Sequence, residues 1–598
     1  MQQRGLMADI RLHATGLVFL AVLTSFSQPD SPVADAAMRG DAATVRQLLA
    51  EGADVNAAQN DGMTALHWAS ERGDEGIVNT LLYAGANTAA VTRLGDYTPL
   101  HLAARVGHAS IVATLLDAGA SPSAGSSTGK VTPLHFVAAS GSAAAVHALV
   151  EHGADVNARE SEWGQTPLIF AVARNRLEAI DALIEAGADV SAETRVLDME
   201  VRQQEDRIAG QLRDKVLASF REARGADADA RGPDPSQVQA AVRAARQHRP
   251  TLTAPQDDSV DYEEAQPTPL SYAQLVGGQG GLTALHHAIR EGYAEATRRL
   301  LSAGADINQV SAGDHTSPIL MATINGHFDL ALELLELGAD GNLASDAGTT
   351  PLFAAVNTQW APKARYPQQQ AYQQQEASYR DVMRALLEGG SDPNARLTKH
   401  LWYMSYTFDL LGIDVSGATP FWRAAYATDI DAMRLLVEHG ADPNIPTQVA
   451  PQRRFGRGDP EEDPSGLPPS EVGGPAVYPI HAASGVGYGE DFAGNAHRHV
   501  PDGWLPAVRY LVEEVGADVN ARDHNGYSAV HHAAARGDNE MILYLVEQGA
   551  DVKTVSRRGQ TTVDMANGPV QRIQPFPETI ALLESLGAKN NNNCLSCE

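Results

Sequence analysis

A short phrase, Gly-Ala-Asp or a near variant, recurs along this 598-residue chain at nearly constant spacing. Its first four steps are 33, 34, 34 and 34 residues long, and a second phrase, Thr-Pro-Leu-His or a variant, keeps the same period. The first phrase occurs at Gly52, Gly85, Gly119, Gly153, Gly187, Gly304, Gly338, Gly390, Gly440, Gly516, Gly549 and Gly587. Such a period is typical of stacked units, each of which buries its apolar side only against its neighbours.

The unit that starts at Thr98 shows the expected local structure most clearly. The Thr98 hydroxyl can cap the unpaired N–H groups of a helix start, and Pro99 stands where a missing N–H costs nothing. Gly107 tolerates the positive φ that ends a helix. The apolar side chains of residues 111–116 then form one stripe of a second helix, which Gly119 ends. We therefore expect two short helices in each unit, followed by a turn-rich connector.

These phrases resemble the signature of the ankyrin repeat family, Thr-Pro-Leu-His-x-Ala with a period of 33 residues. The resemblance covers roughly residues 30–588 apart from three insertions, and about twelve repeats. It implies an all-α repeat solenoid of stacked helix-turn-helix repeats that carry β-hairpin fingers. It also implies a protein-binding role, because members of the family typically bind proteins along the concave face and the fingers.

The N-terminus has the pattern of a secretory signal peptide. Arg4 and Arg11 precede an uncharged run over residues 14–24, and small residues follow up to Gln28. The run is too short to span a bilayer, so no membrane insertion of the mature chain is expected. We therefore expect an exported, bacterial-type protein that is periplasmic or secreted.

The expected segments are a signal peptide at 1–27, repeats 1–5 at 30–195, a helical insertion or linker at 196–281, repeats 6–9 with aromatic-rich insertions at 282–445, a Pro/Gly-rich loop at 446–477, repeats 10–12 at 478–588, and a disordered tail at 589–598.

The charge balance restricts the partners. Lys and Arg number 45 against 74 Asp and Glu, which gives a net charge of −29. A broad basic face for a phosphate backbone is therefore not expected, and nucleic acid is excluded as a partner. The sequence has no nucleophile elbow, P-loop or zinc-protease helix, so neither an enzyme activity nor a cofactor is predicted. Acidic character favours a basic or polar protein client through electrostatic steering.

The leading interpretation is a monomeric, non-catalytic module that binds a protein client outside the cytoplasm. Its contact residues are expected to be large side chains just before or just after the Thr-Pro-Leu-His phrase, where the family exposes its variable positions. They are Trp68, Tyr97, Arg105, Phe136, Trp163, Arg174, Trp402, Tyr403, Tyr406 and Tyr527. One alternative is a structural scaffold or spacer without a single client, and another is a metal- or thiol-dependent activity.

Histidine recurs three residues after the capping position of many units. Because this recurrence follows the repeat period, a structural hydrogen bond between turn and helix is favoured over a ligand or base role. The positions are His67, His101, His135, His286, His481 and His531.

Three insertions interrupt the repeats. The first predicts an amphipathic helix from Leu197 to Phe220 and a second helix from Ser236 to His248, which either pad the stack or form an arm that clamps a partner. The second, from Trp360 to Tyr426, holds 11 of the 34 aromatic residues of the chain. It is interpreted either as an enlarged internal core or as a partner site.

The third insertion, which comprises residues 446–477 and then residues 485–505, and the C-terminal tail carry the residues that suggest chemistry. His497 and His499 lie two residues apart and are candidate ligands of a divalent metal ion, with Glu490, Asp491 and Asp502 near them in the sequence. A hydrogen-bonded loop is nevertheless favoured. Cys594 and Cys597 are the only cysteines. Outside the cytoplasm they are expected to form a local disulfide or a mixed disulfide with a partner.

Overall fold

The computed structural model describes residues 31–224, 232–247, 268–361, 371–401, 411–451, 463–490, 497–570 and 574–595. The chain divides into two compact units. The N-terminal unit comprises Met1–Arg195, Thr283–Ala288 and Tyr293–Ala305. The C-terminal unit comprises Val196–Leu282, Ile289–Gly292 and Asp306–Glu598. In both units the described residues are mostly helical, as the repeat period predicts.

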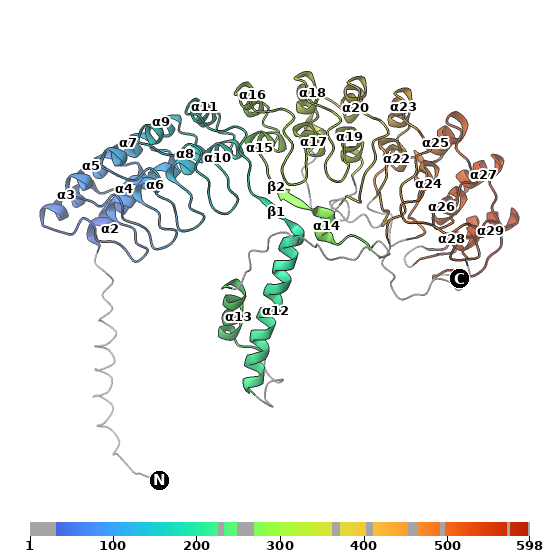
Figure 1. Ribbon diagram of the computed structural model, residues 1–598, viewed down its shortest axis with the longest axis horizontal. Helices are drawn as coiled ribbons and strands as arrows, with labels where there is room; N and C mark the ends of the chain where they lie inside the picture. Colours follow the sequence, from blue (N-terminus) through green and yellow to red (C-terminus); the bar gives the residue numbers. More distant parts are fainter. Residues whose placement is uncertain are drawn as a thin grey trace, which may run out of the picture. The chain divides into compact units, whose positions relative to one another are not determined.

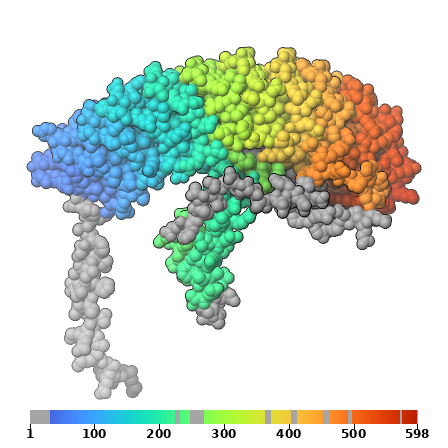
Figure 2. Space-filling model, in the orientation of Figure 1, coloured from blue at the N-terminus to red at the C-terminus, as the bar shows by residue number. Residues whose placement is uncertain are grey.

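The N-terminal unit consists of helix pairs in chain order (Figure 1). The first helices of successive repeats pack side by side, and so do the second helices. The space-filling view shows neighbouring repeats of this unit, blue to cyan, closely packed in sequence order (Figure 2). The pairs are α2 (Pro32–Arg39) with α3 (Ala42–Ala50), α4 (Ala65–Arg72) with α5 (Glu75–Tyr83), α6 (Pro99–Val106) with α7 (Ala109–Asp117), α8 (Pro133–Ser140) with α9 (Ala143–Glu151), and α10 (Pro167–Ala173) with α11 (Leu177–Glu185).

The first helix α6 begins and ends as predicted. Thr98 accepts a hydrogen bond from the backbone N–H of His101, and Gly107 ends α6 with φ 89°. The Thr98 N–H donates to Nδ1 of His101 at 3.1 Å, so Nε2 carries the ring hydrogen and donates to the Val131 carbonyl at 3.2 Å. The expected structural role of the repeated histidine is thereby confirmed, since one ring joins the turn, its helix and the next repeat.

Asparagine provides a second connection between repeats that the sequence analysis missed. Asn157 follows the Gly-Ala-Asp phrase and donates through its amide to the Gly187 carbonyl at 3.5 Å, while its Oδ1 accepts from the Asp189 N–H at 2.8 Å. The same pair of contacts joins Asn520 to Gly549 and Asp551 in the C-terminal unit. The recurrence of Asn two residues after the acidic position was the available signal.

The fingers are tighter and less regular than the expected β-hairpins. One finger is closed by the bond from the Thr92 N–H to the Tyr97 carbonyl at 3.0 Å, and the Arg93 N–H donates to Asp61 of the preceding finger at 2.7 Å. Within the described residues, regular strands are limited to β1 (Val196–Asp198) and β2 (Gly278–Gly280), which pair antiparallel. Hydrogen bonds between neighbouring fingers therefore replace a ladder within each finger.

The C-terminal unit contains the remaining helix pairs and the insertions (Figure 1). Helix α15 (Ala284–Arg290) spans the boundary between the units, and its partner α16 (Ala294–Ser302) belongs to the N-terminal unit. The later pairs are α17 (Pro318–Ile324) with α18 (Phe328–Glu336), α19 (Pro351–Gln359) with α20 (Tyr379–Glu388), α22 (Pro420–Tyr426) with α23 (Ile430–Glu438), α24 (Pro479–Ser484) with α25 (Trp504–Arg509), α26 (Ala529–Ala535) with α27 (Asn539–Glu547), and α28 (Thr562–Ala566) with α29 (Pro577–Ser585). A 3-10 helix (Ala371–Gln374) precedes α20, and α25 continues as a π-helical turn (Tyr510–Glu514).

The first insertion forms the two predicted helices, α12 (Met199–Arg224) and α13 (Pro235–Gln247), which pack on one another. A short helix, α14 (Tyr272–Val276), contacts α12. In the N-terminal unit, α16 packs directly on α11, and Arg299 pairs with Asp181 at 2.5 Å. The repeat stack therefore continues from α11 to α16 across the insertion, and the inserted helices do not pad a break there. In the described part of the chain, α12 included, no helix combines the length and the apolar character that a bilayer span requires.

Candidate functional site

Five predicted contact residues lie together on the N-terminal unit, on or beside the first helices of neighbouring repeats. Helices α4, α6, α8 and α10 pack in this order, so their exposed sides are adjacent. Three of the five side chains are half-buried aromatic rings and two are exposed arginines. With Phe170, a half-buried ring that the sequence analysis missed, we call this set the first-helix surface. Its members are Trp68, Tyr97, Arg105, Phe136, Phe170 and Arg174.

Contacts within the first-helix surface hold its side chains in place. The Tyr97 and Phe136 rings meet edge to face with centroids 5.8 Å apart. The Trp68 indole N–H donates to Gln59 at 2.8 Å. Arg105 pairs with Glu71 of the preceding repeat at 2.5 Å. Preordered aromatic and arginine side chains lose little entropy on binding, which suits them to a protein interface.

Two finger positions of the same unit expose apolar side chains. Trp163, a predicted contact residue, is 56% exposed. Leu94, which the sequence analysis did not select, is 79% exposed and lies at the tip of another finger. A large exposed residue beside a finger glycine was the signal for both positions. Exposed apolar side chains next to half-exposed rings are typical of an interaction surface.

The remaining predicted contact residues do not join this surface. Tyr527 was expected to be exposed, but its side chain is only 1% exposed and its hydroxyl donates to Gln560 at 2.5 Å. That prediction is wrong, because the Tyr527 ring is part of the core against the following repeat. Trp402, Tyr403 and Tyr406 lie outside the described residues, so their role stays a prediction.

The described part of the aromatic-rich region is an internal core. Asp429, the N-cap of α23, is buried and accepts from the Trp360 indole at 2.8 Å and from the Tyr379 hydroxyl at 2.5 Å. Arg423 is also buried and donates from Nε to Asn357 at 2.8 Å. The Trp422 and Tyr426 rings stack with centroids 5.3 Å apart. These contacts favour the interpretation as an enlarged core for the residues that the structure describes.

The two candidate metal ligands of the third insertion serve a structural purpose. Nε2 of His497 lies 2.9 Å from the Tyr426 carbonyl oxygen, and the two rings stack at 4.3 Å. Nδ1 of His499 lies 2.9 Å from the Val500 carbonyl oxygen. The pKa of His497 is lowered to about 3, chiefly by burial and also by the nearby His499 and Arg423. His497 therefore acts as a neutral anchor that ties the insertion to the end of α22.

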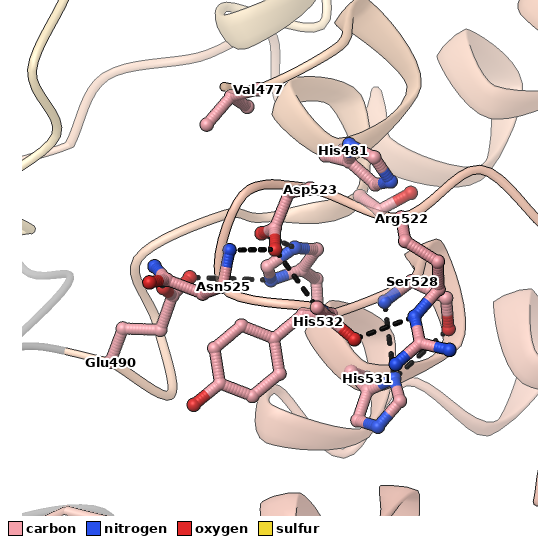
Figure 3. Close-up of polar contacts among 12 residues, drawn as sticks. Val477, His481, Glu490, Arg522, Asp523, Asn525, Ser528, His531 and His532 are labelled. Carbon is pink, nitrogen blue, oxygen red and sulfur yellow. Dashed lines mark hydrogen bonds and ion pairs between the residues drawn. The ribbon is translucent and has the colours of Figure 1, made fainter. Parts of the chain in front are cut away.

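A different polar cluster lies close by in the C-terminal unit (Figure 3). Glu490 follows α24, Asp523 lies in the next finger, and His532 is on α26. Nε2 of His532 is 3.3 Å from Oδ2 of Asp523, and Nδ1 is 3.7 Å from Oε1 of Glu490. The His532 and Asp523 side chains are 0% exposed and that of Glu490 is 13% exposed. We call these three residues the acidic–histidine cluster.

The cluster brings two carboxylates into a poorly solvated place. Burial raises the pKa of Glu490, and the negative charge of Asp523 raises it further. Burial also opposes ionisation of Asp523, but the His532 ring 3.3 Å away and the neighbouring His481 and His524 outweigh it and lower the pKa of Asp523. The sequence analysis placed Glu490 near candidate metal ligands, but it grouped Glu490 with His497 and His499. It missed Asp523 and His532, because they lie more than 30 residues further along the chain.

The cysteine prediction falls at the edge of the described residues. Cys594 is disulfide-bonded and is not a free thiol. Cys597 lies outside the described residues, so its pairing with Cys594 stays a prediction.

Family models of ankyrin repeats match more than half of the chain. A model of three repeat copies matches residues 33–126, 121–194 and 285–397. A model of many copies matches residues 496–546, and a single-repeat model matches residues 416–448. These matches cover both the uninterrupted repeats and the repeats that carry insertions.

Curated proteins are similar over short segments. Ankyrin repeat and SOCS box protein 6 of Homo sapiens is 30% identical over 163 residues, which is 27% of this chain and 36% of that protein. Protein phosphatase 1 regulatory subunit 27 of Mus musculus is 41% identical over 71 residues, or 12% of this chain and 46% of that protein. BCL-6 corepressor-like protein 1 of Homo sapiens is 36% identical over 86 residues, which is 14% of this chain and 4% of that protein. The chain thus spans less than half the length of each of these relatives.

Proposed function

Because this chain belongs to the ankyrin repeat family, whose repeats typically mediate interactions between proteins, we propose that it is a non-catalytic module that binds a protein client. The client docks on the first-helix surface and on the finger tips that carry Leu94 and Trp163. The observation that supports this site most directly is the gathering of large, partly exposed aromatic side chains on neighbouring first helices.

The comparisons and the charge support a protein as the partner. One similar protein is named as a regulatory subunit of a protein phosphatase and another as a corepressor-like protein, names that imply action through other proteins. The net charge of −29 favours a client with a basic or polar surface. The compartment in this proposal, the periplasm or the cell exterior, is supported only by the leader-like pattern of Arg4, Arg11 and residues 14–24.

Crosslinking in the native compartment, followed by mass spectrometry, tests the proposal. The test variant replaces Leu94, Phe136 and Trp163 by alanine. The matched control is Tyr83→Ala, because Tyr83 is a large aromatic residue that is 97% exposed at the end of the second helix α5, away from the proposed site. A central aromatic contact contributes about 2 kcal/mol or more, which corresponds to roughly 30-fold in affinity.

We expect the same crosslinked client to be recovered with the wild type and with Tyr83→Ala, and to be lost from the triple variant. Equal recovery by the triple variant would refute the proposed site and would favour a scaffold without a single client. Circular dichroism of both variants must match the wild type, so that loss of binding is not loss of folding.

A further inference from the structure

The acidic–histidine cluster contains buried polar atoms that nothing in the described part of the chain satisfies. Oδ2 of Asp523 and both ring nitrogens of His532 make no hydrogen bond of acceptable geometry. Buried polar atoms without partners are rare, and each one calls for an explanation such as a bound ion. We propose that Glu490, Asp523 and His532 bind one divalent transition-metal ion, with Zn²⁺ as the best match to their mixed nitrogen and oxygen donors.

The distances fit ligands of a common ion better than hydrogen-bond partners. One donor atom from each residue lies within 4.8 Å of the other two. Nε2 of His532 and Oδ2 of Asp523 are 3.3 Å apart without hydrogen-bond alignment. Two ligands of a tetrahedral zinc ion, each about 2.0–2.1 Å from the metal, are separated by about 3.3 Å. Glu490 supplies the third donor atom of this set through a carboxylate oxygen.

A divalent ion would also balance the charge of the cluster. Ionised Asp523 and Glu490 carry two negative charges in a poorly solvated place, and one divalent ion neutralises both. Arg522 does not fill this role, because its Nε donates to the Gly526 carbonyl at 2.6 Å and its Nη2 donates to the Val555 carbonyl. Nε2 of His481 likewise faces the Ala521 carbonyl at 2.9 Å.

Neighbouring groups hold the carboxylates in place, as they do in known metal sites. Oδ1 of Asp523 accepts from the N–H groups of Asn525 and Tyr527 at 2.9 and 2.8 Å, which leaves Oδ2 directed at the cluster. The Asn525 side chain donates to Oε2 of Glu490 at 2.8 Å, so Oε1 is turned toward His532 (Figure 3). A bound ion would join the insertion after α24 to the next finger and to α26, and would therefore stabilise two consecutive repeats.

Metal binding by the full chain tests the proposal. All proteins carry Cys594→Ser and Cys597→Ser, so that thiolates cannot contribute ligands, and are stripped with a chelator before titration with Zn²⁺. The test variants are Glu490→Gln, which keeps the shape of the partly exposed side chain, and His532→Asn. The matched control is His315→Asn, because His315 pairs with Asp346 at 2.7 Å in an exposed finger of the same unit.

We expect one Zn²⁺ per chain with the parent and with His315→Asn, a rise in unfolding temperature on adding Zn²⁺, and tetrahedral visible absorption with Co²⁺. In Glu490→Gln the affinity should fall by at least about tenfold, and the rise in unfolding temperature should shrink accordingly. If the parent and Glu490→Gln take up Zn²⁺ equally, or if the parent takes up none, the proposal is overturned. His532 would then be an imidazole held between two carboxylates without a metal. His532→Asn gives an independent check, since its Co²⁺ spectrum must lose the nitrogen ligand if it folds.

Discussion

The uninterrupted repeats of the N-terminal unit and the interrupted repeats of the C-terminal unit bury polar side chains in different ways. In the N-terminal unit the main buried polar rings are the repeated histidines, and both nitrogens of His101 meet groups of its own or the next repeat. The buried carboxylate of Glu160 in the same unit also accepts from backbone N–H groups. In the C-terminal unit the buried Arg423 and Asp429 are paired with side chains as well. Regular repeats thus satisfy buried polar groups through the backbone, whereas insertions supply side-chain partners for buried charges.

Arg536 illustrates the second case. Its guanidinium lies 3.9 Å from the centre of the ring of Trp504, at the end of the third insertion, and donates to Asp538 at 2.8 Å. Its Nε also donates to the Ser484 carbonyl, at the end of the helix that precedes the insertion. The segments at the two ends of the insertion therefore both contact the Arg536 guanidinium. A repeat of ordinary length does not contain this arrangement.

The largest expected effect is on the free energy of unfolding, and it appears when two aspartates that cap helices are compared. Asp429→Ala should lower the free energy of unfolding by about 3–5 kcal/mol, because it leaves the Trp360 and Tyr379 donors buried without an acceptor. Asp41 caps α3 through the Thr44 N–H at 3.0 Å in the regular stack, so Asp41→Ala should lower the free energy of unfolding much less, because the groups that lose a partner are close to solvent. Urea unfolding monitored by circular dichroism measures both values. Equal losses would show that the insertions do not change the burial of charge.

The next effect is a dependence of stability on pH that originates in the repeated histidines. Burial lowers the pKa of His101 from 6.5 to about 4, so the folded state stays neutral where the unfolded chain takes up a proton. The contribution of His101 to the free energy of unfolding is therefore fully present above pH 6.5, the pKa of the unfolded chain. It is lost as the pH falls from 6.5 toward 4, by up to about 3 kcal/mol for this ring. The pKa of His67 and that of His135 are lowered in the same direction, again chiefly by burial.

Thermal unfolding at about pH 7.5 and about pH 5 measures this dependence. His101→Gln should lower the unfolding temperature at the higher pH. It should also reduce the difference in unfolding temperature between the two pH values. A wild-type unfolding temperature that does not change with pH would contradict neutral histidines in the folded state.

The smallest effect concerns the surface ion pair of the N-terminal unit. Arg105 and Glu71 are both substantially exposed, so Arg105→Ala should change the free energy of unfolding by no more than about 1 kcal/mol. The same change should weaken client binding, since Arg105 lies on the first-helix surface. A large loss of stability would show that the pair is structural and would remove Arg105 from the contact set.

Local features of the fold were predictable because they depend on neighbours in the sequence. The cap at Thr98, the end of α6 at Gly107 and the structural role of His101 each follow from residues within one repeat or at the start of the next. The burial of Tyr527 was not predictable in this way, because its hydroxyl is satisfied by Gln560 of the following repeat. Tyr97 and Tyr527 both directly precede the capping residue of their repeat, yet Tyr97 is half-buried and Tyr527 is only 1% exposed.

By itself, the sequence determined that short helix pairs repeat and stack, since capping and apolar periodicity act over a few residues and recur with the period. Only the tertiary structure decided where the insertions fold and which side chains they meet. His497 was directed to the Tyr426 carbonyl, while Glu490 was brought to Asp523 and His532. The physical reason is that these contacts depend on the closure of long loops and on burial against other repeats. Neither process produces a periodic pattern in the sequence of the residues that make the contacts.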